Sequence, residues 1–266
     1  MSRIDWLVCR ADSTANAVES DIEVAAKEGL KVEAAPSLRL LTFLSSAEQE
    51  ALAALRFPKR RREWLLGRWT AKHLLRQAHP AYAALPLDAI TVGSDPDGAP
   101  YLAVAGEGRL PLSLSISHRD DRAFCALWSP PPSLPGAAVG ADLELVEPRD
   151  PAFVRDFFTS GEAGRIWHCP DDRRDTLVTA IWSAKEAVLK VLRLGLTVDT
   201  RRVEIVHVSG LDAPESPHLL DCWAAIQVRC TLPDIPPLCA WWRPQEGYVL
   251  TLAAVPSPSD LPCPDP

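Results

Sequence analysis

The sequence lacks the features that mark several large classes of protein. Its 266 residues carry a formal net charge of -7, so it has no excess of positive charge of the kind that nucleic-acid-binding proteins use. No apolar run approaches the length that spans a bilayer, and the first residues show no basic segment followed by a long apolar one. We therefore expect no nucleic-acid partner, no membrane partner and a cytoplasmic location.

Paired cysteines and a phosphate-binding glycine loop are also missing. The seven cysteines never form a C-x-x-C pair, which argues against a zinc site and against a disulfide framework. We expect scattered reduced thiols, most of them buried. A G-x-x-x-x-G-K-[ST] loop is absent as well, and this disfavours a nucleotide phosphotransferase of the P-loop kind.

Proline, by contrast, is frequent and clustered. The run "SPPPSLPG" (129–136) interrupts the apolar pattern, because proline removes backbone donors and cannot continue a helix or sheet interior. We place a boundary there. The sequence thus predicts an N-terminal half over 1–130, a C-terminal half over 131–255 and a Pro-rich tail over 256–266.

The two halves resemble each other. "FLSSAEQEALAAL" begins at Phe43 and "FFTSGEAGRIW" at Phe157, and each contains a hydroxyl residue followed three positions later by Glu. This spacing is typical of a capping box that opens a helix. Further on, "RRREWLLGRWTAKHLL" parallels "RRDTLVTAIWSAKEAVL" at nearly the same separation. Chance similarity between two amphipathic helices is the alternative, but two ordered matches favour an internal repeat.

Each half then contains a capped helix, a long helix and strands after it, such as "AITVGS" and "LTVDTRRVEIVHV". Helices and strands segregate within each half, so we predict an α+β fold. The copies differ at one place, where His73 in the first stands for Glu186 in the second. That asymmetry points to a site in the second copy.

A strand with two acidic residues is predicted in "AVGADLELV". Its alternation puts Gly140, Asp142 and Glu144 on one face. A half-exposed strand with a polar outer face is one interpretation. The other is a site for a hard cation such as Mg²⁺, which takes carboxylate oxygens as ligands.

The helix "IWSAKEAVLK" (181–190) carries an unusual charged row. Residues four apart share a helix face, so Trp182, Glu186 and Lys190 lie in line, with Lys185 in the adjacent row. An exposed Glu-to-Lys pair is the simpler interpretation. The large aromatic Trp182 in the same row disfavours a purely solvated face.

Three further segments offer groups that bind anions. "LSISH" ends a predicted strand at Ser117 and His118, and both side chains can donate hydrogen bonds to phosphate. "KRRREW" (59–64) presents guanidinium groups that match phosphate geometry, although a solvated charge run is the usual interpretation. In the turn "DPDGAPYL", Gly98 would let the backbone approach a ligand closely.

Four of these segments, in order, resemble the motifs of a known family. "DGAPYL", "LSISH", "VGADLE" and "WSAKEAVLKVLRLGL" are similar to the successive motifs of the Sfp-type 4'-phosphopantetheinyl transferases, in the subgroup with W-x-x-K-E-A. The resemblance implies an α+β fold of two similar halves related by a pseudo-twofold axis, with the active site at their interface. It also implies Mg²⁺ and coenzyme A as co-substrate.

The activity implied is that of a holo-[acyl-carrier-protein] synthase. Such an enzyme moves the 4'-phosphopantetheine arm of coenzyme A to a serine of an apo carrier protein and releases 3',5'-ADP. Acyl, peptidyl and aryl carriers of fatty acid, polyketide and nonribosomal peptide biosynthesis are the implied partners, and a monomer is the implied state. The alternative is a non-catalytic relative that binds coenzyme A or a carrier protein.

Site residues follow from the motifs by position. Asp142, Glu144 and Glu186 are the implied metal ligands. Glu186 is also the implied base for the carrier serine, directly or through water, and Asp142 and Lys190 complete the catalytic set. Residues implied to bind the cofactor are Arg60, Arg61, Arg62, Gly98, Ala99, Pro100, Ser117, His118, Lys185 and Lys190, with structural support as the alternative role of Lys185.

The sequence departs from the family pattern at three places. Ala141 replaces a larger β-branched residue on the buried face of its strand, which is a change in packing. Ala99 replaces a lysine of the usual G-K-P motif. In many members basic residues precede the equivalent of Gly67, whereas this chain has "EQEA" (48–51) in that stretch. Binding of the 3'-phosphate should therefore depend on "KRRREW".

Overall fold

A computed structural model describes residues 3–11, 42–211 and 222–255. These residues form two compact units that divide between Leu127 and Trp128, with residues up to Asp5 grouped with the second unit. We call 6–127 the N-terminal unit and the part from Trp128 onward the C-terminal unit. The division lies close to the boundary predicted at 130, while the predicted Pro-rich tail lies outside the described residues.

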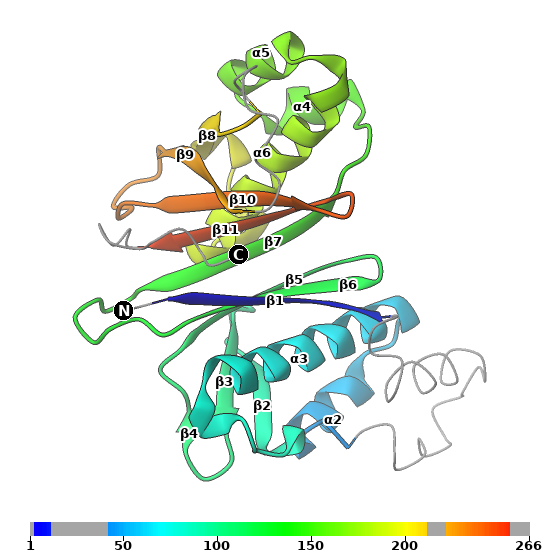
Figure 1. Ribbon diagram of the computed structural model, residues 1–266, viewed down its shortest axis with the longest axis vertical. Coiled ribbons are helices and arrows are strands. Elements are labelled where there is room, and N and C mark those ends of the chain that lie inside the picture. Colours follow the sequence, from blue (N-terminus) through cyan, green and yellow to red (C-terminus); the bar gives the residue numbers. More distant parts are fainter. Residues whose placement is uncertain (1–2, 12–41, 212–221, 256–266) are drawn as a thin grey trace. The chain divides into compact units, whose positions relative to one another are not determined.

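In the described residues of the N-terminal unit there are two α-helices and two small sheets (Figure 1). The helices are α2 (Ser46–Ala54) and α3 (Pro58–Ala78). One sheet has the order β1-β6-β5, from β1 (Ile4–Arg10), β6 (Arg122–Trp128) and β5 (Ser113–Arg119). The other has the order β2-β3-β4, from β2 (Ile90–Ser94), β3 (Pro100–Val104) and β4 (Gly108–Arg109).

Local sequence explains where these helices begin. Ser45 accepts a hydrogen bond from the Glu48 amide, and Glu48 accepts one from the Ser45 amide, so the predicted capping box is present. Pro58 occupies the first turn of α3, where its missing N–H costs no hydrogen bond. Leu74 and Leu75 of α3 then pack on Ile90 and Leu102 in the core of the unit.

The C-terminal unit is built around one antiparallel sheet. Its order is β7-β11-β10-β9-β8, from β7 (Ala138–Leu145), β11 (Tyr248–Val255), β10 (Cys239–Gln245), β9 (Ala224–Cys230) and β8 (Val203–Val208). The α-helices described in this unit are α4 (Pro151–Phe157), α5 (Ser160–His168) and α6 (Asp171–Val191). The mixture of helices and antiparallel strands confirms the predicted α+β class.

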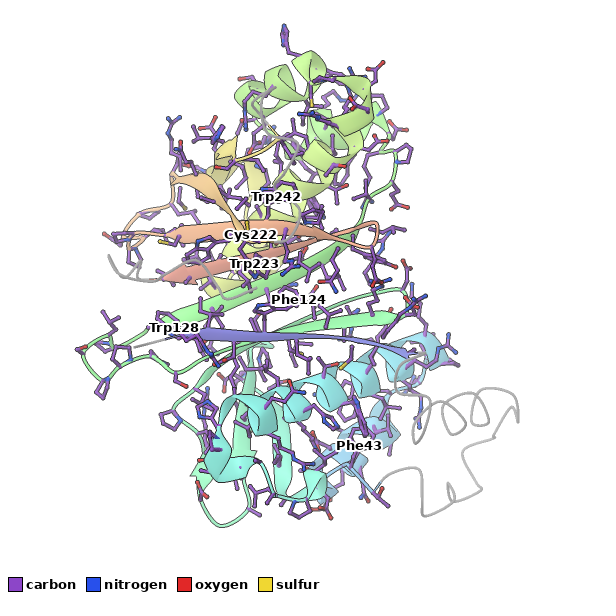
Figure 2. All side chains as sticks on the ribbon, in the orientation of Figure 1. Phe43, Phe124, Trp128, Cys222, Trp223 and Trp242 are labelled. Atoms are coloured by element: carbon purple, nitrogen blue, oxygen red, sulfur yellow. The ribbon has the colours of Figure 1, made fainter. Side chains whose placement is uncertain are left out.

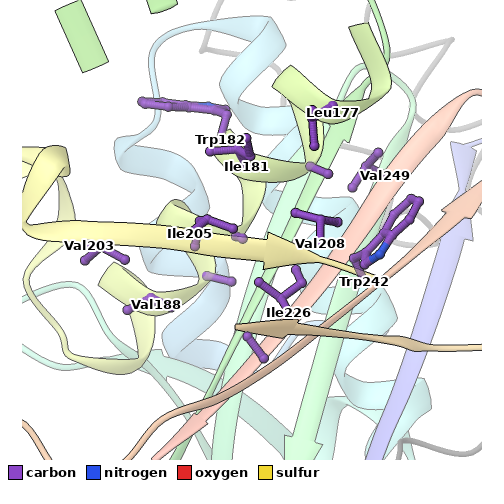
Figure 3. Close-up of a cluster of buried hydrophobic side chains, with 14 of the residues drawn as sticks. Leu177, Ile181, Trp182, Val188, Val203, Ile205, Val208, Ile226, Trp242 and Val249 are labelled. Carbon is purple, nitrogen blue, oxygen red and sulfur yellow. The ribbon is translucent and has the colours of Figure 1, made fainter. Parts of the chain in front are cut away.

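Helix α6 packs along this sheet. Figure 3 shows Ile181 and Val188 of α6 among Ile205 and Val208 of β8, and all four are fully buried. Trp242 of β10, labelled in Figures 2 and 3, donates its indole N–H to the Ser209 carbonyl at 3.0 Å, so its one polar atom is satisfied. Thirteen of the helix's residues are buried, so α6 is a core helix with little free surface.

The repeated sequences make matching contacts in the two units. In the N-terminal unit, Glu48 caps α2, accepts from the Val92 amide and pairs with Lys72. In the C-terminal unit, Glu162 caps α5, accepts from the Ile205 amide and pairs with Lys185. The repeat therefore preserves one buried arrangement that joins a short helix, a long helix and a strand.

Candidate functional site

Gly140 brings α6 against β7. A Cβ placed on Gly140 would lie 2.0 Å from the Ala187 carbonyl oxygen, a backbone atom that cannot turn aside. Only glycine permits this approach. The face of β7 that carries Gly140, Asp142 and Glu144 is consequently covered by the helix, and the interpretation as a polar outer face is wrong for its central residues: Asp142 is only 3% exposed.

Asp142 is held by two side chains of α6. Lys190 donates to its Oδ1 at 2.7 Å and to the Ala141 carbonyl at 3.0 Å. Ser183 donates to its Oδ2 at 2.7 Å. The structure thus brings together Asp142 and Lys190, as the motifs imply, and the burial of a carboxylate is offset by a cation and a hydroxyl.

Glu144 lies two residues further along β7 and pairs with a cation outside the motifs. Arg149 Nη2 is 3.2 Å from Glu144 Oε2, and its Nη1 is 3.2 Å from Glu147. The Arg149 guanidinium also lies 5.4 Å from the ring centroid of Phe153. Arg149 is a neighbour of the site that motif reasoning does not identify.

Glu186 is the acidic residue of the site whose pKa is shifted. Burial is the main cause that raises its pKa to about 7, and the negative charge of Asp142 adds to the increase. Lys190 opposes this shift, and Glu144 contributes a smaller increase. Asp142 and Glu144 are therefore close enough to repel the charged form of Glu186, and a carboxyl group with a pKa near neutral suits proton transfer.

The donor chemistry of this cluster fits a hard divalent cation, since carboxylate oxygens are its preferred ligands. In the described parts of the chain, however, no three His, Cys, Asp or Glu side chains are arranged so that they could hold a metal ion as they stand. Lys190 occupies one oxygen of Asp142, and Arg149 pairs with Glu144. Binding of a cation would have to replace these basic groups.

The Lys185 side chain lies against α5 and β8. Its side chain is 0% exposed, 2.9 Å from Glu162, and it donates to the Thr200 and Val203 carbonyls at 3.1 and 2.6 Å. All three protons of the ammonium group are thereby used. These contacts favour the alternative role of Lys185 in structural support, and its contact with the cofactor stays a prediction.

In the N-terminal unit, Arg60 and His118 lie together. Arg60 donates to His118 Nε2 at 2.9 Å, so this nitrogen accepts and carries no proton. Glu63 is close to both, at 3.9 Å from Arg60 and 3.7 Å from His118. Ser117, the preceding residue of β5, is 6% exposed. The pairing of an arginine with the strand-end histidine joins two segments that the sequence predicts to bind phosphate.

The other two arginines of the run differ from Arg60. Arg61 donates to the Leu52 and Leu55 carbonyls at 3.0 and 3.1 Å, so it caps the end of α2. Arg62 is exposed. The sequence predicts that all three arginines bind phosphate, whereas the Arg61 side chain stabilises the C-terminal end of α2.

Arg68 lies on the same face of α3 as Arg60, and the sequence analysis did not identify it as a candidate site residue. Its guanidinium lies 3.5 Å from the Trp64 ring centroid, and its Nε is buried with no hydrogen-bond partner among the described residues. Burial lowers its pKa to about 10. The i, i+4, i+8 spacing of Arg60, Trp64 and Arg68 is the signal by which the sequence could have identified it.

Gly98, Ala99 and Pro100 lie at the turn between β2 and β3. Gly98 adopts a φ of +88°, which favours glycine. The Ala99 carbonyl accepts from the Asp95 amide at 2.8 Å, and the Ala99 amide donates to Asp97 at 3.2 Å. The backbone of Ala99 is therefore used inside the turn, and its role in binding a nucleotide stays a prediction.

The acidic "EQEA" stretch also has a structural explanation. Glu48 is 2% exposed and pairs with Lys72, which is itself fully buried. The carboxylate is required by the capping box and by that lysine. This departure from the family pattern thus reflects the internal structure of the unit.

Comparison with known proteins finds a family match over part of the chain. Residues 138–250 match the family model described as the 4'-phosphopantetheinyl transferase superfamily. The 4'-phosphopantetheinyl transferase psf-1 of Bacillus pumilus is 26% identical over 160 residues, which are 60% of this chain and 62% of that protein. The chain thus matches less than two thirds of the length of this curated relative.

Solved structures show weaker similarity. A holo-(acyl-carrier-protein) synthase from Bacillus anthracis str. Ames in complex with CoA (3',5'-ADP) is 19% identical, with a TM-score of 0.32, over 47% of this chain and 93% of the other. The ACPS-CoA complex of Chronobacterium ammoniagenes is 21% identical, with a TM-score of 0.33, over 48% and 96%. TM-scores of this size establish neither fold nor ligand for this chain.

Proposed function

We propose that this chain, which belongs over residues 138–250 to the 4'-phosphopantetheinyl transferase superfamily, transfers the phosphopantetheine arm of coenzyme A to a serine of an apo carrier protein. One observation carries the proposal. In the C-terminal unit Lys190 pairs with Asp142 at 2.7 Å. Glu186 lies one turn before Lys190 on α6, and burial together with the charges of Asp142 and Glu144 raises its pKa to about 7. This set contains a base, two further carboxylates and a cation, as transfer of a charged phosphoryl group requires.

In the proposed reaction the hydroxyl oxygen of the carrier serine forms a bond to the phosphorus that bears pantetheine. The bond between that phosphorus and the bridging oxygen breaks, and its electron pair leaves with 3',5'-ADP. Glu186 accepts the serine proton. Lys190, one turn further along α6, offers a positive charge to the phosphate oxygens once it is released from Asp142.

Asp142, Glu144 and Glu186 would hold Mg²⁺ as part of this proposal. The ion, when bound, supplies charge neutralisation at the pyrophosphate. Asp142 and Glu144 are already oriented by hydrogen bonds and ion pairs, and such partners fix the direction of ligand oxygens. Carboxylate repulsion at Glu186 supports the same assignment, because a cation relieves it.

The N-terminal unit would supply contacts to the nucleotide part of coenzyme A. Arg60 and His118 are the supported pair for phosphate, while Arg62, Ser117 and the turn at Gly98 to Pro100 complete the expected set. We further propose that the two units are similar halves related by a pseudo-twofold axis, with coenzyme A bound at their interface. The matching Glu48–Lys72 and Glu162–Lys185 contacts, each within one unit, support the similarity of the two halves.

Acyl, peptidyl and aryl carriers are the proposed partners, with the protein acting as a monomer. A cytoplasmic location is proposed as well. The six cysteines in the described segments are all free, as is usual for proteins of a reducing compartment. Among those segments, no helix has the length and hydropathy needed to cross a bilayer.

The test is incubation of the purified protein with coenzyme A, Mg²⁺ and a panel of apo carriers of the three kinds. A carrier whose mass increases by one phosphopantetheine arm is the expected result. No mass increase with any carrier of the panel would contradict the proposal.

A non-catalytic relative is the second candidate, and one observation favours it. Both oxygens of Asp142 are occupied, by Lys190 and by Ser183, as expected if the carboxylate had only a structural role. Binding of coenzyme A without turnover, measured by calorimetry beside the mass assay, would support this candidate over the enzyme.

A further inference from the structure

Asp142 is attached to a line of buried hydroxyl groups. Ser183 Oγ lies 2.7 Å from Asp142 Oδ2, and Thr251 Oγ1 lies 2.8 Å from Ser183 Oγ. Ser183 and Thr251 are both 0% exposed. The three residues come from three elements, β7, α6 and β11, and Thr251 is the direct cross-strand partner of Asp142.

Proton counting gives this line a direction. A serine hydroxyl has one proton, and Ser183 donates it to the carboxylate of Asp142. The contact with Thr251 must then use a lone pair of Ser183, so Thr251 is the donor. Hydrogen bonds therefore run from Thr251 to Ser183 and from Ser183 to Asp142, and each strengthens the next in a dry environment.

Other hydroxyls on the long helices behave differently. Thr179, one turn before Ser183 on α6, donates to the Asp175 carbonyl of its own helix at 2.7 Å. Thr70 occupies the place of Ser183 in the first copy of the repeat and donates to the Leu66 carbonyl, also in its own helix, at 2.8 Å. Bonding four residues back is the usual choice for a hydroxyl inside a helix. Ser183 alone of these three is directed to a carboxylate.

We propose that Ser183 and Thr251 are positioning residues, which hold Oδ2 of Asp142 so that Oδ1 is the oxygen that exchanges Lys190 for a divalent cation. This inference rests on the proposed function and concerns two residues to which the motif resemblance assigns no role. Lys190 is 29% exposed, whereas Ser183 is fully buried. The lysine can therefore move away from Asp142, while the hydroxyl stays in place.

The test measures Mg²⁺ binding and transfer in the full chain with four variants. Thr251→Val removes the hydroxyl at nearly constant volume, Thr251→Ser retains it, and Ser183→Ala removes the middle group. Thr179→Val is the matched control, because it also removes a buried hydroxyl. Calorimetric titration with Mg²⁺ gives the dissociation constant, and transfer rates at varied Mg²⁺ give the concentration for half-maximal rate.

We expect Ser183→Ala to weaken Mg²⁺ binding by about 10–100-fold, the range for lost partners of metal ligands. Thr251→Val affects Asp142 only through Ser183, so it should weaken Mg²⁺ binding by about tenfold, the lower end of this range. Thr251→Ser and Thr179→Val should stay within about twofold of the wild type, as expected when no partner of the ligand is lost. The half-maximal Mg²⁺ concentration for transfer should shift in parallel.

Failure of the inference and failure of the proposed function give different results. An active wild type whose Mg²⁺ affinity is unchanged in both Ser183→Ala and Thr251→Val would overturn the inference alone. A wild type that neither binds Mg²⁺ nor transfers would overturn the proposed function and the inference with it. If Thr251→Val does not fold, the Mg²⁺ affinities of Ser183→Ala and Thr179→Val are compared instead. Equal affinities of these two variants would overturn the inference.

Discussion

The Nζ atom of Lys185 lies 2.9 Å from Oε2 of Glu162, and neither side chain is exposed to solvent. Burial lowers the pKa of Lys185, and the charge of Glu162 opposes this shift. Both groups also have backbone partners, since Lys185 donates to two carbonyls and Glu162 accepts from the Ile205 amide. The lysine of the W-x-x-K-E motif is thus a structural residue.

Removal of Lys185 should consequently affect stability. Lys185→Met leaves the Glu162 carboxylate buried beside an apolar group, and loss of one partner of a buried pair costs about 3–5 kcal/mol. Urea denaturation followed by circular dichroism measures the change. Lys59→Met is the control, since Lys59 is exposed and lies 3.8 Å from Glu63. It should change the free energy of unfolding by about 0.5 kcal/mol or less. Equal effects of the two variants would contradict the structural role.

Gly140→Ala should separate α6 from β7. Its new methyl group would meet the Ala187 carbonyl oxygen at 2.0 Å and the Val191 amide nitrogen at 2.9 Å, and both are backbone atoms of α6 that cannot turn aside. We expect a loss of more than about 3 kcal/mol in unfolding free energy, or a folded protein without activity. Gly164→Ala is the matched control in α5, where a Cβ meets nothing within 4 Å, and it should stabilise by about 0.5–1 kcal/mol. A stable, active Gly140→Ala protein would show that the close approach is wrong.

The pKa of Glu186 predicts a pH dependence of stability. Because its pKa in the folded chain is about 7, above the ordinary value of 4.5, the folded state binds more protons than the unfolded state between these values. Stability contributed by the protonated group is complete below about pH 4.5 and is lost as pH rises to about 7. The free energy of unfolding of Glu186→Gln minus that of the wild type should therefore increase by about 1–3 kcal/mol from pH 5 to pH 8.

Denaturation in EDTA at the two pH values measures this difference. EDTA is needed because bound metal would favour the charged carboxylate and hide the effect. A stability difference between the variant and the wild type that is equal at pH 5 and pH 8 would contradict a raised pKa.

Binding of Mg²⁺ should release protons below pH 7. A carboxylate must lose its proton to become a ligand, and Glu186 is mostly protonated at pH 6 if its pKa is about 7. The apparent affinity should rise by up to about tenfold per pH unit below pH 7 and then level off. Calorimetry in two buffers with different ionisation enthalpies counts the protons, and Glu186→Gln should release none. Affinity independent of pH would exclude Glu186 from the ligand set.

Features that depend on short sequence spacing were predicted correctly. Both capping boxes, at Ser45 and Thr159, are present, because the two partners lie within one helical turn. The alternation in 138–145 and the helical row of Glu186 and Lys190 are likewise read from local periodicity. The predicted strand "LTVDTRRVEIVHV" was only partly right, since β8 begins at Val203 and Gly195–Thr197 forms a short 3-10 helix.

Contacts between distant residues could not be predicted in this way. Ser183 and Thr251 are 68 positions apart, and Asp142 and Ser183 are 41 apart, so no local pattern connects them. Lys185 and Lys190 both lie in the motif segment of α6, yet Lys185 is fully buried and Lys190 is partly exposed. That distinction follows from which face of α6 packs against α5 and β8, and it is a property of the tertiary structure.

The most direct test of the account compares three proteins in the carrier assay: the wild type, Glu186→Gln and His73→Gln. His73 is the residue of the N-terminal unit that stands in the repeat where Glu186 stands. With coenzyme A, Mg²⁺ and an apo carrier that the wild type modifies, Glu186→Gln should transfer about 10²–10⁴-fold more slowly, the range for loss of a general base. His73→Gln should match the wild type. A Glu186→Gln protein that is folded and transfers at the wild-type rate would contradict the central role of this carboxylate.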